Sequence, residues 1–460
     1  MKTYQDFLKK SGSEQDKKEF ILEAISEHKQ SGMYNLAADA EEYAHQRNST
    51  IMNYQKLLYT VSGKAVPDNY SANYKLCSNF FDRFITQENQ YLLGNGVTLE
   101  NDANKKKLGK KFDQQLQKAG RDALVEGVSF GFWNYDHLES YKLTEFVPLY
   151  DEETGALMGG IRFWQLEYNK PLRATLFELD GYTDYIKKKN EQIKVLNEKR
   201  NYKQIITEGG VDGTIIRDGG HYPSFPIIPL WASDKKQSCF VGMKQNIDAY
   251  DLIKSGFAND LDDASMIYWT IQNAGGMDDI DLARFVERMK TVRAAVVDGD
   301  AGAKAEAHTM DVPYQSRVAY LERLENDLYN DFQALNVKSF QGGQKTATEI
   351  AAAYQPFDNK VDQYEYCVLD FLEELFKLVG IEDNPTFKRS RIVNQLEETQ
   401  MILTAAQYLD DETILKHLPF LTPEEVDEIQ KRKAEEDLDR FNNNEPDEPP
   451  EYKQEETENA

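Results

Sequence analysis

Residues 241–264, VGMKQNIDAYDLIKSGFANDLDDA, and residues 316–336, SRVAYLERLENDLYNDFQALN, decide the fold of this chain. In the first segment five apolar residues recur at helical spacing, and most of the acids fall on the remaining arc. These apolar residues are Ile247, Tyr250, Ile253, Phe257 and Leu261. The second segment repeats the pattern with Val318, Leu321, Leu324, Leu328, Phe332 and Leu335. Because such narrow apolar stripes need neighbours to bury them, the pattern predicts a helical hairpin in a bundle or ring of several subunits.

Length and charge limit the function classes. The chain has 460 residues, which predicts two or more structural modules. Its net charge of −25 and isoelectric point of about 4.8 indicate a surface that repels nucleic acid and anionic membranes. The composition therefore disfavours a protein that grips DNA and allows one that lets DNA pass.

No segment of the sequence predicts a membrane protein. The first twenty residues lack the apolar region of a signal peptide, and no apolar run approaches the roughly 20 residues that span a bilayer. The three cysteines Cys77, Cys239 and Cys367 are far apart, which is typical of reduced cytosolic thiols. We expect a protein that is made and used in soluble form.

The parts around the hairpin differ in their periodicity. Residues 14–62 read as peripheral charged helices, and residues 105–131 as a further helix. After Trp133 the period changes to two, and turn residues separate the segments, which predicts an antiparallel meander. Between the two acidic helices we expect a helix at 279–290, a strand at 291–299, a loop at 300–308 and a strand at 309–314.

The C-terminal third is predicted to be helical. Residues 346–380 read as a long helix that Pro356 kinks or breaks, and residues 391–440 as further helices. The last residues, 441–460, are rich in acids and prolines with almost no apolar side chains, which predicts a disordered acidic tail.

Motifs for chemistry are weak. Gly342-Gly343-Gln344-Lys345-Thr346 resembles the end of a phosphate-binding loop, but that motif needs Gly directly before Lys, so a flexible loop between helices is the favoured interpretation. The acid groups at 260, 262 and 263 and at 278, 279 and 281 favour solvated helix faces over a metal site. The basic run at 187–189 favours a solvated helix. We predict no catalytic residues, no metal and no cofactor.

Four segments in the same order along the chain resemble the portal proteins of tailed double-stranded DNA phages, of the siphophage type. They are KLCSNFFDRFITQENQYLLGNGVTL (75–99), FVPLYDEETGALMGGIRFWQLE (146–167), SFPIIPLWASDKKQSCFVGMKQNIDAYDLIKSGFANDLDD (224–263) and RIVNQLEETQMILTAAQYLDDETILKHLP (391–419). The resemblance covers roughly residues 73–440 and contains no catalytic motif. It implies an α+β, mainly helical fold with wing, stem, clip and crown, assembled as a ring around a central channel.

The resemblance also implies a division of the chain. Residues 1–235 would form the wing, 236–264 the first stem helix, 265–314 the clip and 315–336 the second stem helix. Residues 337–346 would form the tunnel loop, 347–384 a kinked helix that connects wing and crown, 385–440 the crown and 441–460 the disordered tail.

The implied function is that of a channel. About twelve copies would close into a ring at one capsid vertex, through which the terminase large subunit packages double-stranded DNA that is later ejected. The ring would nucleate head assembly with scaffold and major capsid protein and then seat the head-tail adaptor protein. It would be assembled in the host cytoplasm and reside in the virion.

Two groups of residues would line this channel. Acids of the first stem helix would form a wall that repels DNA, so that DNA passes without being held; they are Asp248, Asp251, Asp260, Asp262 and Asp263. The tunnel loop would supply the few groups that touch DNA transiently, on a loop made mobile by glycines; it contains Lys338, Gln341, Gly342, Gly343, Gln344 and Lys345.

Two alternatives come from other classes. One is a metal-dependent cytosolic phosphodiesterase that uses the acid clusters, and it predicts a monomer or dimer with divalent-ion-dependent turnover. The other is an oligomeric scaffold or adaptor without a pore. The particle mass and an end-on image of the particle distinguish all three.

Overall fold

The computed structural model describes residues 2–59, 63–69, 71–209, 213–264, 268–272, 304–308, 314–340 and 347–390, together with 280, 284 and isolated positions between 402 and 435. The chain divides into two compact units. The first contains residues 1–337 and 354–390, and the second contains residues 338–353 and 391–460. In the second unit residues 413–415 and 428–433 are helical.

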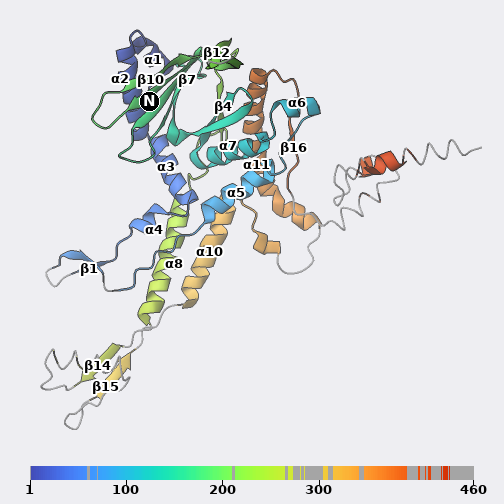
Figure 1. Ribbon diagram of the computed structural model, residues 1–460. Coiled ribbons are helices and arrows are strands. Elements are labelled where there is room, and N and C mark those ends of the chain that lie inside the picture. Colours follow the sequence, from blue (N-terminus) through green and yellow to red (C-terminus); the bar gives the residue numbers. More distant parts are fainter. Residues whose placement is uncertain are drawn as a thin grey trace, which may run out of the picture. The chain divides into compact units, whose positions relative to one another are not determined.

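An antiparallel five-stranded sheet forms part of the first unit, with the strand order β10-β9-β8-β7-β6 (Figure 1). Its strands are β6 (Phe146–Tyr150), β7 (Leu157–Trp164), β8 (Leu172–Glu178), β9 (Gly181–Lys187) and β10 (Lys194–Arg200). Consecutive strands are neighbours throughout, which confirms the predicted meander. The solvated helix predicted around Lys187–Lys189 is wrong, because these residues end β9 and enter the turn to β10. Asn190, with φ of 65°, supplies the left-handed residue of that turn.

Helices α1 (Tyr4–Lys10) and α2 (Glu14–Gln30) pack on this sheet. Phe20 and Ile21 of α2 are fully buried in one cluster with Val147, Ile161 and Leu176 of the strands. Within the predicted helical range 14–62, α2 is a helix that buries one face on this sheet, whereas Leu57–Tyr59 form a strand. The apolar residues of α2, spaced by one and four positions, make a stripe wide enough to cover a sheet.

A second, three-stranded sheet has the order β13-β4-β5. Its strands are β13 (Ile227–Trp231), β4 (Val128–Asn134) and β5 (His137–Lys142), and helix α7 (Phe112–Glu126) precedes β4. The predicted helix over 105–131 therefore ends early, because Gly127 adopts a left-handed φ of 95° and the chain turns directly into β4. Aromatic contacts join the two sheets, with the Phe130 and Phe146 ring centroids 4.5 Å apart.

The long helix α11 (Ala347–Val379) runs through Pro356 without interruption, so the predicted break does not occur. Tyr354 and Phe357, on either side of the proline, are almost completely buried, and this packing offsets the lost backbone hydrogen bond. Farther along, α11 lies so close to β4 that a Cβ atom at Gly131 would be 2.5 Å from the Phe371 ring. Tyr91 of α5 (Phe80–Leu93) donates a 2.6 Å hydrogen bond to Asp358 of α11.

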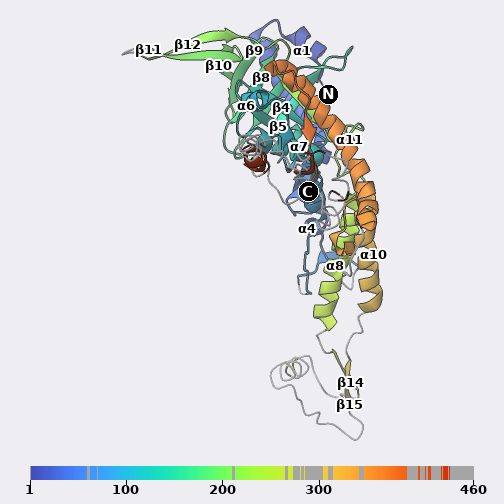
Figure 2. The same cartoon turned by 90° about the vertical axis from the view of Figure 1, so that its right-hand side faces the viewer.

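Two long helices, α8 (Lys244–Ala264) and α10 (Tyr314–Phe332), run side by side in both views (Figures 1 and 2). They correspond to the two predicted acidic helices. Between them in the sequence, β14 (Tyr268–Gln272) pairs with β15 (Lys304–His308). The prediction of a loop over 300–308 is wrong for Lys304–His308, whose alternation of long and small side chains suits a strand. Ile280 and Arg284 are helical, as predicted. The predicted strand at 291–299 lies outside the described residues, as does the one at 309–314 except for Tyr314, which begins α10 instead.

The remaining elements are short or connect larger ones. They are α3 (Gly32–Ala44), α4 (Ser49–Asn53), β1 (Leu57–Tyr59), β2 (Ala65–Pro67), β3 (Val97–Thr98), α6 (Asp102–Lys107), η1 (Leu143–Glu145), β11 (Lys203–Gly209), β12 (Gly213–Gly220), η2 (Val337–Phe340) and β16 (Thr386–Phe387). Within the described part of the chain, no helix is both long and apolar enough to cross a membrane.

Candidate functional site: a helical hairpin rooted in the first unit

The α8–α10 hairpin is antiparallel and is joined at both ends by side-chain contacts. Near the start of α8, Asn246 donates a 2.8 Å hydrogen bond to Asp331 at the end of α10. Near the other end, Asp260 forms an ion pair with Arg317, whose guanidinium also lies over the Phe257 ring. These contacts fix the register of the two helices against each other.

Helix α10 is anchored on α5. Phe332 stacks on Phe84 with ring centroids 4.9 Å apart, and Tyr329 contacts the same ring edge-on at 5.0 Å. The Gln87 amide exchanges two 3.1 Å hydrogen bonds with the backbone of Leu335, one as donor and one as acceptor. The end of α10 is therefore held by both apolar packing and a two-point polar contact.

Helix α8 is clamped through its first half by α3 and α4. Asp248 accepts hydrogen bonds from the hydroxyls of Tyr43 and, at 2.8 Å, Thr50. Lys244 forms an ion pair with Asp39 of α3. Burial and the neighbouring Asp248 raise the pKa of Tyr43 to about 12, so its hydroxyl remains a donor at neutral pH.

A short segment before α5, residues 74–78, lies along α8, and we name it the strap. Its alternate backbone N–H groups donate to Asn259 (2.7 Å from Tyr74), Ser255 (3.0 Å from Leu76) and Asp251 (2.9 Å from Ser78). The spacings match, because four residues of a helix rise about 6 Å and two residues of an extended segment about 6.6 Å. The strap therefore runs antiparallel to α8 with one hydrogen bond per helical turn.

The residues of α8 that accept these bonds are the buried ones. Asp251, Ser255 and Asn259 are 0%, 2% and 7% exposed. The Asp251 carboxylate also accepts from the Asn48 amide, and burial raises its pKa despite these donors. A polar stripe with a period of four thus faces the strap, and each of its members has a hydrogen-bond partner.

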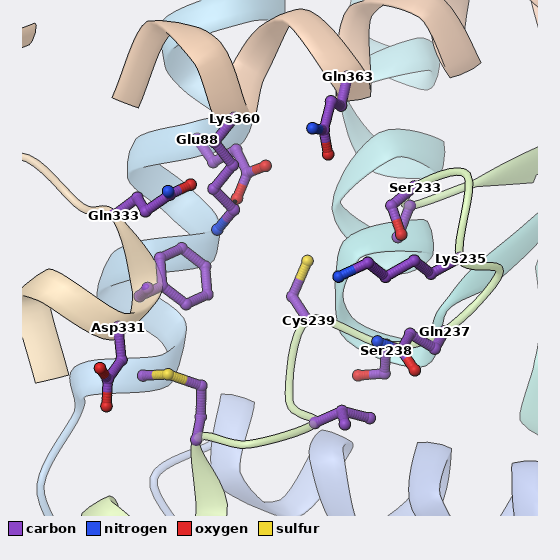
Figure 3. Close-up of a pocket in the computed structure, with 14 residues that line it drawn as sticks. Glu88, Ser233, Lys235, Gln237, Ser238, Cys239, Asp331, Gln333, Lys360 and Gln363 are labelled. Atoms are coloured by element: carbon purple, nitrogen blue, oxygen red, sulfur yellow. Dashed lines mark ion pairs between the residues drawn. The ribbon is translucent and has the colours of Figure 1, made fainter. Parts of the chain in front are cut away.

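A cavity of about 230 Å³ lies near the roots of both helices, between α5, α11 and the segment that leads into α8 (Figure 3). Glu88 of α5 and Lys360 of α11 lie side by side there and form a 2.8 Å ion pair, with the Lys360 ammonium over the Phe332 ring. Burial raises the pKa of the Cys239 thiol to about 12, which keeps it protonated and unreactive. The cavity is a feature of helix packing whose buried carboxylate already has a partner.

The structure changes the interpretation of the predicted acidic wall. Asp248 and Asp251 accept hydrogen bonds from α3, α4 and the strap, and Asp251 is fully buried, so Asp251 does not face a channel, whereas a place for the partly exposed Asp248 in the wall stays a prediction. The reason is that short polar side chains on α8 satisfy backbone and side-chain donors of the strap, α3 and α4. Asp260 pairs with Arg317, and Asp262 lies in the last turn of α8 with Asp263. Whether these three acids face a channel stays a prediction.

The predicted tunnel loop is described only at its start. Lys338 lies in the 3₁₀ helix η2 and is exposed. Gln341, Gly342, Gly343, Gln344 and Lys345 lie outside the described residues. Their proposed role in contacting DNA therefore rests on the sequence.

Sequence reasoning missed Ser255, Asn259 and Asn48. A signal was present, because Asp251, Ser255 and Asn259 recur every four residues and all three are residue types that bond neighbouring backbone groups. Such a stripe on a helix indicates a partner with free backbone N–H groups. Among the described residues, no group of three or more His, Cys, Asp or Glu side chains is arranged to hold a metal ion.

Comparisons with known proteins agree on one family. The sequence model of the family described as "Phage portal protein, SPP1 Gp6-like" matches residues 25–438. The portal protein of Bacillus phage SPP1 is 23% identical over 411 residues, which cover 81% of this chain and 78% of that protein. The portal protein of Clostridium phage phiCD119 is 26% identical over 224 residues, 47% of this chain; the match spans about half of that protein, 49% of its length.

Solved structures with a similar chain include those of gene transfer agent particles. A chain of "Virion of native gene transfer agent (GTA) particle" has a TM-score of 0.44 and 11% identity over 74% of this chain and 89% of its own. A chain of "Neck of empty GTA particle computed with C6 symmetry" has a TM-score of 0.45 and 10% identity over 74% of this chain and 90% of its own.

Proposed function

The chain belongs to the phage portal protein family of the SPP1 Gp6-like type, and we propose from this that about twelve copies close into a ring at one capsid vertex. The ring would surround a channel through which double-stranded DNA enters the head and later leaves it. The observation that carries the proposal is the family match over residues 25–438, which includes the α8–α10 hairpin and both sheets. In this role the chain conducts DNA and performs no chemistry of its own.

The surface of the hairpin supports an oligomer. The predicted apolar stripe of α8 is incompletely covered within one chain, because Tyr250, Ile253 and Phe257 are only partly buried and Leu261 is 51% exposed. Since exposed apolar side chains along one helix favour burial by a partner, neighbouring copies are the natural cover. A ring closes through such contacts when each copy uses two different surfaces and the rotation between copies closes.

The family also suggests the parts of the particle. We propose α8 and α10 as the stem, residues 265–314 as the clip, residues 1–235 with most of α11 as the wing, and residues 385–440 as the crown. The partners would be the terminase large subunit, scaffold and major capsid protein, and the head-tail adaptor, at the portal vertex of the virion. Assembly would take place in the host cytoplasm.

The charge of the chain suits a conduit. At a net charge of −25, the ring as a whole repels DNA and would release it readily, because few phosphates would exchange counterions for protein cations. Lys338 and Lys345 of the tunnel loop would be the cations placed to touch DNA in transit. Since Asp251 is fully buried, the acids left for the channel wall are Asp248, Asp260, Asp262 and Asp263.

Electron microscopy of the purified protein tests the proposal. We expect rings of about twelve copies with a central channel, alone or after addition of scaffold and capsid protein. A monomer or dimer that cleaves phosphodiesters with a divalent ion would support the enzyme alternative. An oligomer without a channel would support the scaffold alternative.

A further inference from the structure

An arm precedes the strap, and it has structure of its own. Residues 54–73 contain the β1–β2 hairpin, whose base is closed by a 2.8 Å hydrogen bond from Asp68 N–H to the Lys56 carbonyl. The Asp68 carboxylate is buried and accepts from Ser71 N–H at 3.0 Å. Because the strap continues the arm and is bonded to α8, the arm has a fixed root on the hairpin.

The arm exposes large apolar side chains. Tyr54 and Leu57 of the arm are 45% and 48% exposed, and Tyr74, where the arm joins the strap, is 49% exposed. Three such side chains within one short segment make a surface that favours burial by a partner. In the described part of this chain, each of them is about half covered.

The arm and strap are basic in a strongly acidic chain. Residues 54–78 carry three lysines and one aspartate, a net charge of +2, whereas the whole chain carries −25. Helix α10 carries two arginines and four acids, a net charge of −2, and it exposes Tyr320 to 47%. The two surfaces are complementary in charge, and each presents an exposed aromatic side chain.

The two surfaces lie on opposite sides of the hairpin. In both views α8 lies between the arm and α10 (Figures 1 and 2). Tyr74 is bonded to Asn259, next to the Asp260–Arg317 pair, so Tyr74 and Tyr320 lie at a similar level along the hairpin. One chain therefore cannot bring its own arm to the open side of α10.

We propose that the arm of each subunit docks on the exposed side of α10, around Tyr320, of the neighbouring copy. The inference rests on the proposed function, because it needs a ring. Rotation about a ring axis keeps every residue at its own height, so an axis along the hairpin brings Tyr74, where the arm joins the strap, to the level of Tyr320 in α10 of the next copy. The contact would clasp adjacent stems and cover Tyr54 and Leu57.

Cysteine cross-linking tests the contact in the full-length protein. The variant with Leu57→Cys and Tyr320→Cys should give covalent dimers and higher multimers with a short bismaleimide reagent. Each single variant should give only background, which also controls for the three native cysteines. A matched control pairs Tyr320→Cys with Leu166→Cys, which replaces a leucine that is 84% exposed in the β7–β8 turn.

The outcomes separate the inference from the proposed function. Rings that form normally but cross-link no more than the Leu166 control would overturn the arm contact and leave the portal function standing. A cross-link within one chain would overturn it as well. A protein that forms no ring under any condition would instead contradict the proposed function.

Charge reversal gives a second, independent test of the contact between the arm and α10. Lys56→Glu with Lys64→Glu should lower the yield of rings at low salt, and the melting temperature of the subunit is measured alongside, because both lysines also have interactions within their own chain. Adding Glu322→Lys and Asp327→Lys on α10 should restore the yield, because the signs are again complementary. Failure of this rescue, with α10 folded, would contradict the proposed contact.

Discussion

The two halves of the α8–α10 hairpin differ in what holds them. The inner half, with the start of α8 and the end of α10, is tied by polar contacts from α3, α4 and the strap to α8, and by aromatic packing of α10 on α5. In the outer half the strap still bonds Ser255 and Asn259 of α8, whereas α10 contacts α8 through the Asp260–Arg317 pair and the Phe257–Tyr314 ring contact at 5.8 Å. The difference teaches that one helix can serve two purposes, with its buried polar stripe fixing it to its own subunit and its half-covered apolar stripe left for neighbours.

The largest effect is expected at Asp251. Asp251→Ala leaves Ser78 N–H and the Asn48 amide buried without an acceptor, so we expect a loss of about 3 kcal/mol in the free energy of unfolding. Gln315→Ala, at an exposed position of the outer half, should change it by less than about 0.5 kcal/mol. Urea unfolding of the two variants checks the contrast. Equal losses would show that the two halves are held equally.

The stability of the part of the first unit around α7, outside the hairpin, should depend on pH. Burial raises the pKa of Glu126, which accepts two hydrogen bonds from Thr144, to about 8. Since the folded chain then holds a proton that the unfolded chain releases above pH 4.5, this group's stabilisation is lost as pH rises toward 8.

Glu126→Gln removes that dependence. Relative to the wild type, its melting temperature should therefore increase steadily from pH 5 to pH 8.5. The corresponding difference in the free energy of unfolding changes by up to about 1.4 kcal/mol per pH unit. Glu145→Gln, at an exposed position close in sequence, is the control and should follow the wild type. A constant difference between wild type and Glu126→Gln across this range would contradict the assignment.

A smaller effect is expected at the outer end of the strap. Asn259→Ala removes the acceptor of Tyr74 N–H, a loss of about 1 kcal/mol that better helix propensity offsets by up to about 0.7 kcal/mol. Asn330→Ala, at an exposed position of α10, has only the propensity gain. Hydrogen exchange should therefore become faster at Tyr74 in the first variant alone. Unchanged protection of Tyr74 would show that the strap does not depend on this bond.

The smallest effect on stability is expected in the tunnel loop. Lys338→Ala with Lys345→Ala should leave the melting temperature and the rings unchanged, because Lys338 is exposed and lies outside the first unit. Packaged DNA length or genome retention should fall, since the two cations that we propose to touch DNA are lost. Wild-type packaging by this variant would contradict the proposed contact between the tunnel loop and DNA.

Periodicity predicted the elements whose burial follows a simple rule. The helices α8 and α10 and the meander were predicted because their apolar residues recur with periods near 3.6 and 2. The ends of α7 and β9 were missed, because Gly127 and Asn190 act through left-handed backbone conformations that a periodicity does not reveal. The sheet beneath α2 was not predicted, because an apolar face on a helix does not show what lies opposite it.

The sequence predicted the family of the protein, but it did not predict which side chains of the candidate site contact one another. The acids of α8 were treated alike in the sequence, yet Asp251 is buried and bonded while Asp260 forms a pair across the hairpin. Only the folded structure distinguishes them, because the strap lies more than 170 residues away from Asp251 in the sequence. The tunnel-loop residues keep their sequence-based role as a prediction.

The central claim is that this chain forms a portal ring through its stem. Cryo-electron microscopy of the purified full-length protein, with and without scaffold and capsid protein, tests it most directly. The account predicts a closed ring of about twelve copies in which α8 and α10 surround a channel, with Asp251 turned toward its own subunit. A monodisperse monomer under every salt condition and with both partners present would contradict it.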